Sequence, residues 1–219
     1  MKEGKTAYVL LAIVVFLLPV MVFAEEPEPW RYSLSLHYGY ANMVAGTAGL
    51  TNSSRSYEKD LCSGMSWDFQ YYYRYGRKRI FGLGAIYSGF TSKGTLQYST
   101  DHVYTHYIAP QLNLSLWPTS RFFMGGNTGF GYFMYRNNST VFGKGRRVMG
   151  DMPAVNFGLN GTYCLSQRIG ISLNMQYIFT ELYKVHIDYH DEITKVKFPP
   201  EKAMQASRLN ISGGINFFF

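Results

Sequence analysis

Residues 169–180 read IGISLNMQYIFT, and their alternation of apolar and polar side chains decides the fold class. Successive side chains of a β-strand point to opposite faces of a sheet, so alternate residues share a face. One face is wholly apolar or aromatic and consists of Ile169, Ile171, Leu173, Met175, Tyr177 and Phe179. On the other face, Gly170, Ser172, Asn174 and Gln176 are small or polar and uncharged. The stretch therefore predicts an amphipathic strand.

Seven further stretches share this period of two, although Phe123 and Phe133 interrupt the polar face of one of them. They are residues 31–41, 64–75, 81–91, 103–116, 122–135, 154–165 and 208–219. Each is long enough to cross a bilayer at a tilt, which takes ~9–11 residues. The links between them alternate in length. The short links are 76–79, 118–120 and 166–167, and the long ones are 42–63, 92–102, 136–153 and 181–207. The pattern predicts an all-β, eight-stranded antiparallel up-and-down transmembrane β-barrel.

The distribution of charge distinguishes this barrel from a soluble, lipocalin-like one, which is the main alternative. The eight stretches contain no lysine and no glutamate, although the whole chain has a formal net charge of +7. Their charged residues all lie on the polar face, and are Arg31, Asp68, Arg74 and Arg208. A soluble barrel would expose the apolar face to water or bury unpaired amides at a cost of ~1–3 kcal/mol each. A bilayer removes this conflict, because lipid covers the apolar face.

The N-terminus has the features of a secretory signal peptide. A short basic region, MKEGK, precedes an apolar segment that ends at Ala24, and EEPEPW follows. We expect cleavage after Ala24, which leaves a barrel domain at 25–219. The alternative is a retained membrane anchor, which Pro19 within the apolar segment disfavours.

These features resemble the small outer-membrane barrels of Gram-negative bacteria, namely the OmpX and OmpA-barrel group and similar Bacteroidota proteins. The resemblance rests on the leader, the eight alternating stretches and the closing INFFF. It implies an outer-membrane location, contact with membrane lipid and lipopolysaccharide, and a monomer. It also implies that the barrel-assembly machinery reads alternate terminal residues, here Ile215, Phe217 and Phe219. Phe218 points to the other face, so a polar substitution there should impair assembly far less than one at Phe219.

The interior of an eight-stranded barrel is just wide enough for its own side chains. We therefore expect a polar plug and no diffusive pore. If Arg31 and Arg74 are level on the first two strands, antiparallel pairing brings His37 opposite Asp68. The simpler interpretation is a structural ion pair, and a functional relay is the alternative.

The two cysteines, Cys62 and Cys164, belong to opposite ends of two strands that run in the same direction. A separation of about one membrane thickness, ~30 Å, exceeds the reach of a disulfide. The sequence therefore predicts no disulfide between them.

The segment YKVHIDYHDEITKVKFPP (183–200) predicts a hairpin above the membrane that turns near His190. If it keeps the phase of 169–180, His186, Asp188 and His190 continue the lumen face. Three such ligands could bind a metal, but a solvated face with ordinary polar residues is the simpler interpretation. We expect no metal or other cofactor.

Two other clusters carry chemistry that function could use. The link 136–153 contains a basic cluster that could meet lipopolysaccharide phosphates or acidic glycans, namely Arg136, Lys144, Arg146 and Arg147. Lipid A deacylases and palmitoyl transferases are enzymes of similar size, and the cluster Ser99, Asp101 and His102 could supply a nucleophile and a base. However, no histidine here has a serine two residues further on, as the deacylase motif requires.

We therefore expect a non-catalytic protein that acts in surface interaction, adhesion or envelope integrity through its long loops. An extracellular protein or glycan is the expected partner, and nucleic acid is not. The alternatives are a narrow conduit for small apolar molecules and a lipid A-modifying enzyme.

Overall fold

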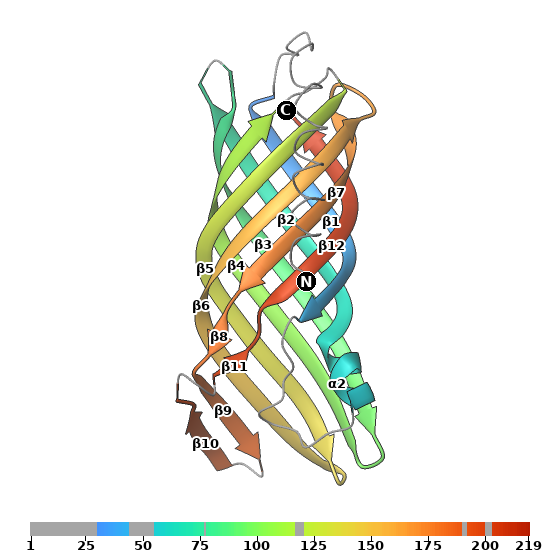
Figure 1. Ribbon diagram of the computed structural model, residues 1–219, viewed down its shortest axis with the longest axis vertical. Coiled ribbons are helices and arrows are strands. Elements are labelled where there is room, and N and C mark those ends of the chain that lie inside the picture. Colours follow the sequence, from blue (N-terminus) through green and yellow to red (C-terminus); the bar gives the residue numbers. More distant parts are fainter. Residues whose placement is uncertain (1–29, 44–54, 77, 117–120, 190–191, 200–202) are drawn as a thin grey trace, which may run out of the picture.

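The computed structural model describes residues 30–43, 55–76, 78–116, 121–189, 192–199 and 203–219. The expected leader, 1–24, lies outside these residues. Eight long strands form a closed antiparallel ring (Figure 1). They are β1 (Tyr32–Met43), β2 (Ser63–Tyr75), β3 (Phe81–Leu96), β4 (Ser99–Leu116), β5 (Phe122–Val141), β6 (Lys144–Cys164), β7 (Ile169–Phe179) and β12 (Arg208–Phe218). Strand β12 lies between β7 and β1 and closes the ring. The predicted fold class is confirmed.

The two faces of the wall differ as the alternation requires. Leu173 on the outer face is 70% exposed, whereas Gln176 on the inner face is 1% exposed. Asp68, Arg74 and Arg208 all lie inside, with exposed fractions of at most 4%. The described residues include no helix that is both long and apolar enough to cross a bilayer.

Two of the predicted long loops are instead continuations of strands. The pairing of β3 with β4 runs on to Leu96 and Ser99, and that of β5 with β6 runs on to Val141 and Lys144. Phe142 and Gly143 have φ values of 50° and 77°, as the central residues of a type I′ hairpin turn require. The polar composition of these segments favours loops, but their polar residues still alternate between two faces.

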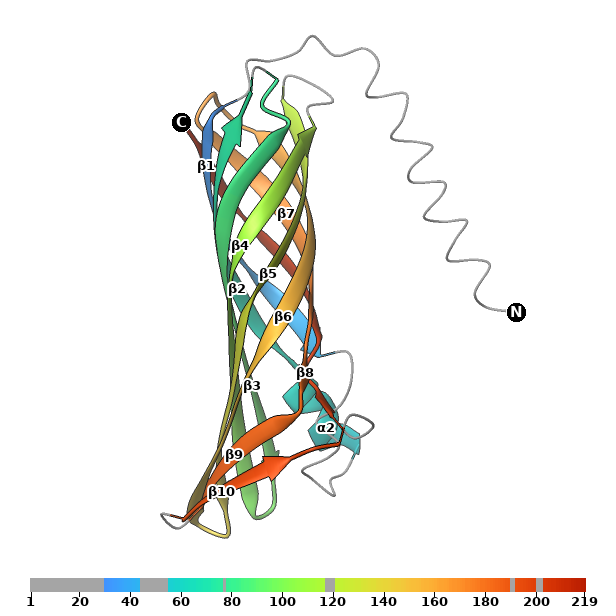
Figure 2. The same ribbon diagram turned by 90° about the vertical axis from the view of Figure 1, so that its left-hand side faces the viewer.

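The extended strands form an open sheet beyond one end of the barrel (Figure 2). We call this sheet the platform, and define it as residues 92–96, 99–103, 136–141 and 144–152 together with two added strands. These are β9 (Lys184–Tyr189), which pairs with β6, and β10 (Glu192–Lys197), which pairs with β9. Two short strands, β8 (Glu181–Leu182) and β11 (Met204–Gln205), pair with each other between the barrel and the hairpin of β9 and β10 (Figure 1). The other end of the barrel has the short links, and we call it the short-turn end.

A helix packs on the inner face of the platform. This helix, α2 (Arg55–Cys62), lies within the predicted link 42–63 and was not predicted. Its Tyr57 and Leu61 are one turn apart and each is 2% exposed. Gly94 of β3 provides the space for them, because a Cβ there would lie 2.8 Å from Leu61 Cγ.

The predicted hairpin is present, but its faces are reversed. Leu182 is buried in phase with β7, and the chain then bends at Tyr183. Beyond the bend, Val185 and Ile187 pack into the core, whereas His186 and Asp188 share the opposite face. The single extra residue at the bend changes which side chains point inward, since the side-chain period of a strand is two.

The interior has a polar half and an apolar half. The polar half is the one nearer the short turns, and it forms the expected polar plug. Its residues are all at most 6% exposed, with Arg208 at the border, and they are Gln70, Tyr72, Arg74, Gln111, Asn113, Asn156, Asn160, Asn174, Gln176 and Arg208. Towards the platform the interior becomes a hydrophobic core that the sequence did not predict. Among its members are Phe90, Val103, Tyr107, Phe133, Val148 and Ile178. A smaller cluster of Phe123, Cys164 and Phe218 closes the short-turn end, with Trp30 stacked on Phe218 at 4.3 Å.

The cysteines lie at opposite ends of the barrel, as their positions in the sequence indicate. Cys62 ends α2 beneath the platform. Cys164 ends β6, where its backbone N–H donates to the carbonyl of Arg121 at the short-turn end.

Candidate functional site

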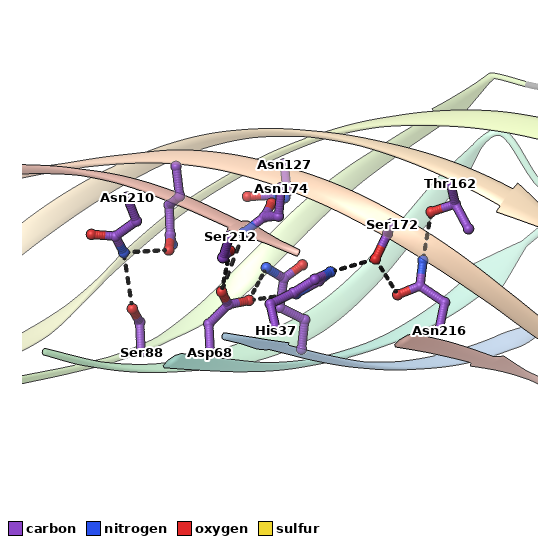
Figure 3. Close-up of polar contacts among 12 residues, drawn as sticks. His37, Asp68, Ser88, Asn127, Thr162, Ser172, Asn174, Asn210, Ser212 and Asn216 are labelled. Carbon is purple, nitrogen blue, oxygen red and sulfur yellow. Dashed lines mark hydrogen bonds and ion pairs between the residues drawn. The ribbon is translucent and has the colours of Figure 1, made fainter. Parts of the chain in front are cut away.

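The polar half of the lumen is centred on three side chains in series (Figure 3). His37 Nδ1 lies 2.8 Å from Asp68 Oδ1, and His37 Nε2 lies 2.8 Å from Ser172 Oγ. The pairing of His37 with Asp68 follows from the register in which the Arg74 N–H donates to the Arg31 carbonyl. The sequence therefore placed the ion pair correctly, but it gave no indication of Ser172, which comes from β7.

The Asp68 carboxylate accepts several other hydrogen bonds. Gln70 Nε2 donates to it at 2.6 Å, and Asn174 Nδ2 and Ser212 Oγ donate at 3.3 Å each. These donors come from β2, β7 and β12, so the carboxylate joins strands across the lumen. A buried carboxylate is stable only with such partners.

The order Asp68, His37, Ser172 is that of a catalytic triad, but its surroundings do not suit catalysis. Ser172 is 7% exposed and His37 is 3% exposed, which keeps substrates away from the hydroxyl. Ser172 Oγ also donates to Asn216 Oδ1 at 3.4 Å. The hydroxyl proton of Ser172 is then directed at Asn216, whereas a nucleophilic serine donates its proton to the histidine. The series connects β1, β2 and β7 across the lumen.

Arg208 is a second buried charge in the lumen, and it is fully enclosed. Its guanidinium donates to Thr105 Oγ1 at 2.5 Å and to Ser88 Oγ at 2.8 Å, and it lies 5.6 Å from the centre of the Phe90 ring. It therefore sits where the polar half of the interior meets the hydrophobic core.

A separate polar cluster fixes α2 to the platform around Asp101, which is fully buried. Tyr57 Oη donates to this carboxylate, and so do Asn137 Nδ2 at 2.8 Å and Ser99 Oγ at 3.0 Å. Arg146 pairs with it at 3.6 Å. Burial, together with the hydrogen bond to Asp101, raises the pKa of Tyr57 far above its usual value, so the phenol remains a donor at all physiological pH values.

The cluster of Ser99, Asp101 and His102, which the alternative of an enzyme would require, is not assembled. Ser99 and Asp101 share the inner face of the platform, whereas His102 points to the outer face and stacks with Tyr104. The period of two in β4 separates a base at 102 from a nucleophile at 99. His106 is also on the outer face, where its Nδ1 lies 2.8 Å from Tyr87 Oη.

Three of the four predicted basic residues meet in one groove at the tip of the platform. Lys144, Arg146 and Arg147 line a pocket of about 670 Å³ with Asn138, Ser139 and Asp188. Arg136 is not part of it, because it lies further down β5, opposite Met149. We call this pocket the basic groove. Lys144 and Arg147 are exposed, whereas Arg146 turns towards Asp101.

The predicted metal ligands are only partly within the described residues. His186 and Asp188 share a face of β9, and His190 lies outside the described part of the chain. Among the residues that the structure describes, no group of three metal-binding side chains occurs. The described part of the chain therefore does not support the alternative of a metal site at these residues.

The predicted assembly residues lie on the outer face. Ile215 and Phe219 are 46% and 64% exposed there, and they share this face with Phe217. Phe218 is fully buried on the other face.

The closed ring of strands and its apolar outer face define a small eight-stranded antiparallel β-barrel, and solved outer-membrane proteins share this fold. The chain is similar to Neisserial surface protein A, with a TM-score of 0.56 and 10% identity over 86% of this chain and 97% of that one. It is also similar to a major outer membrane protein of Thermus thermophilus, with a TM-score of 0.60 and 9% identity over 86% and 98%. A third similar structure is Ail, the attachment invasion locus protein of Yersinia pestis, with a TM-score of 0.50 and 10% identity over 86% and 99%. No protein-family model and no curated protein matches the sequence.

Proposed function

We propose that this is a non-catalytic protein of the Gram-negative outer membrane that binds a partner at the cell surface through its platform. The orientation follows from the barrel class, in which short turns face the periplasm and long segments face outward. The platform is then extracellular. Export by the leader at 1–24 and assembly by the barrel machinery are parts of this proposal.

The platform is the observation that carries the proposal. Four barrel strands continue beyond the belt of apolar side chains, and α2 and β9 enlarge the ordered surface. A sheet with its own buried core holds side chains in fixed positions, which favours recognition. The name of the similar protein Ail includes attachment, which agrees with a surface role.

The basic groove is the part of the platform with the clearest chemical preference. Asp188 is the single carboxylate among the described residues that line the groove, and Lys144 and Arg147 place two exposed positive charges beside the amide of Asn138. Such groups bind sulfate, phosphate or carboxylate groups through charge-assisted hydrogen bonds. We therefore propose an acidic glycan, or the phosphates of lipopolysaccharide, as the partner.

The hairpin of β9 and β10 gives little support to a second mode of binding, in which an extended segment of a partner adds a strand to an open sheet edge. One edge of β9 is already paired with β6, so only β10 offers an outer edge. Its exposed Lys195 and Lys197 are typical of edges that resist pairing. The conduit alternative is also weaker, because the hydrophobic core fills the lumen below the platform.

Loss of the two exposed charges in the basic groove should abolish most anionic binding. In cells that display the protein, we expect the Lys144→Gln/Arg147→Gln variant to bind fluorescent dextran sulfate about tenfold more weakly than wild type, a change of roughly 1.4 kcal/mol. The Lys59→Gln/Lys93→Gln variant removes two exposed charges elsewhere on the extracellular side and is the matched control. Uncharged dextran measures background. Equal losses in both variants would show that net charge, and not the groove, controls binding.

A further inference from the structure

The short-turn end of the barrel is a collar of positive charge. Arg31, Arg121 and Arg168 directly precede β1, β5 and β7 at this end, and Lys78 and Arg79 lie just before β3. The described members are Arg31, Lys78, Arg79, Arg121 and Arg168. The described residues at this end, in 30–33, 73–82, 113–116, 121–124, 162–172 and 214–219, include no aspartate or glutamate. Because this end lies in the periplasm, the collar faces the inner leaflet of the outer membrane.

Three arginines of this end meet in one pocket. Arg31, Arg74 and Arg79 line a space of about 370 Å³ together with Tyr73, Tyr75 and Gly76. The backbone N–H of Arg74 donates to the carbonyl of Arg31 at 2.7 Å, which holds the first two strands together beside it. None of the three arginines forms an ion pair with a carboxylate of the described residues.

Arg74 is the buried member of this group and is 1% exposed. Its Nε donates to Ser115 Oγ at 2.7 Å, and its guanidinium lies 5.3 Å from the centre of the Phe123 ring. Its Nη1 has no acceptor among the described residues. A buried cation without a counter-charge is unfavourable, so this arrangement favours an anion nearby.

Arg79 has an unusual backbone for its residue type, with φ at 48°. Glycine occupies this left-handed region readily, whereas a residue with a Cβ does so at a cost. Gly76, in the same turn, has φ at 79°. Glycine would therefore adopt the backbone conformation of this position at a lower cost than arginine. The residue present is nevertheless an arginine, and it lines the pocket.

The two tyrosines show the depth of the pocket in the membrane. Tyr73 and Tyr75 belong to the outer face of β2 and are 39% and 50% exposed. Tyrosines at the end of a spanning strand lie at the depth of the lipid headgroups. The pocket thus opens where phosphate groups are concentrated.

We propose that Arg31, Arg74 and Arg79 form a binding site for the phosphate group of an anionic phospholipid in the periplasmic leaflet. The exposed Arg31 and the partly exposed Arg79 contact the phosphate oxygens, and the buried charge of Arg74 lies at the base of the site. This site is independent of the extracellular basic groove. It fixes the short-turn end of the barrel at the level of the headgroups.

Native mass spectrometry of the full barrel in detergent micelles tests the site with phosphatidylglycerol as the probe. We expect Arg31→Gln/Arg79→Gln to weaken retention of this lipid about tenfold. Lys78→Gln/Arg168→Gln removes two cations of the same collar outside the pocket and should retain the lipid as wild type does. Equal retention by the pocket variant and wild type would overturn the proposal.

Two further arms separate binding from folding and identify the source of the phosphate. Arg79→Gly should lose lipid while its melting temperature stays equal to or above that of wild type, because glycine relieves the left-handed backbone. Lipid retention by Arg79→Gly would contradict a contact from this residue. Displacement of the lipid by inorganic phosphate at millimolar concentration would assign the site to free phosphate. Resistance to displacement would assign it to the headgroup.

Discussion

Replacement of Asp68 by asparagine should lower the free energy of unfolding by about 3 kcal/mol, because it removes one member of a buried ion pair. The asparagine has almost the same shape, so no cavity forms. Its amide, however, presents donors where His37, Gln70, Asn174 and Ser212 already donate. At least one buried donor then loses its acceptor.

Urea unfolding of the refolded barrel in micelles measures this loss of stability. The folded fraction at each urea concentration is the fraction of the protein that migrates as the folded form in gel electrophoresis. Asp60→Asn removes the same charge from the exposed surface of α2 and should change the stability by less than about 0.5 kcal/mol. Ser172→Ala should cost about 1 kcal/mol, the value of one hydrogen bond. Wild-type stability of the Asp68→Asn variant would show that the lumen network does not hold the strands together.

Replacement of Phe218 by alanine should destabilise the folded barrel by about 3–5 kcal/mol, as for other fully buried aromatic residues. Phe218 is stacked on Trp30 and meets the edge of Phe123 at 6.1 Å, so its loss leaves a cavity at the short-turn end. Phe219 is 64% exposed on the lipid-facing side, and its replacement by alanine should affect the folded state much less.

Phe219 serves as the control position for Phe218, and two quantities are measured for each variant: its assembly in cells and its stability after refolding. The expected role of Phe219 is in assembly, so Phe219→Ala should reach the membrane poorly in cells yet show wild-type stability after refolding without the machinery. Phe218→Ala should be unstable in both settings. If both variants lose refolded stability equally, the division between an inner and an outer terminal residue is wrong.

The strand pattern was predictable because it depends on local alternation alone. A strand with one face towards a polar lumen and the other towards lipid must alternate polar and apolar side chains. All eight barrel strands have this period of two in their sequence. The register of β1 and β2 was predictable as well, since levelling Arg31 with Arg74 also aligns His37 with Asp68.

The platform was missed because its strands are polar on both faces near the tip. Segments such as 136–141 contain the residues that are common in loops, and pairing with neighbours determines their structure. The hydrophobic core had a signal in the sequence, because Phe133 interrupts the polar face of its strand and belongs to this core. That face is polar only in the half of the barrel near the short turns.

Sequence reasoning about the hairpin failed at a single residue. The bend at Tyr183 adds one position, and this exchanges the faces of all later side chains in β9. His186 and Asp188 therefore point away from the core. The basic groove also needed the structure, because only the pairing of β6 with β9 brings Asp188 opposite Arg147.

The topology of the barrel in the cell tests the central claim, a surface-exposed platform on an outer-membrane barrel, most directly. In a Cys62→Ser/Cys164→Ser background, Thr194→Cys places a thiol on β10 and Lys78→Cys places one in a short turn, both at exposed positions. A membrane-impermeant maleimide applied to intact cells should label Thr194→Cys alone, and Lys78→Cys should react only after the outer membrane is permeabilised. Labelling of Lys78→Cys in intact cells, or protection of Thr194→Cys, would contradict the account.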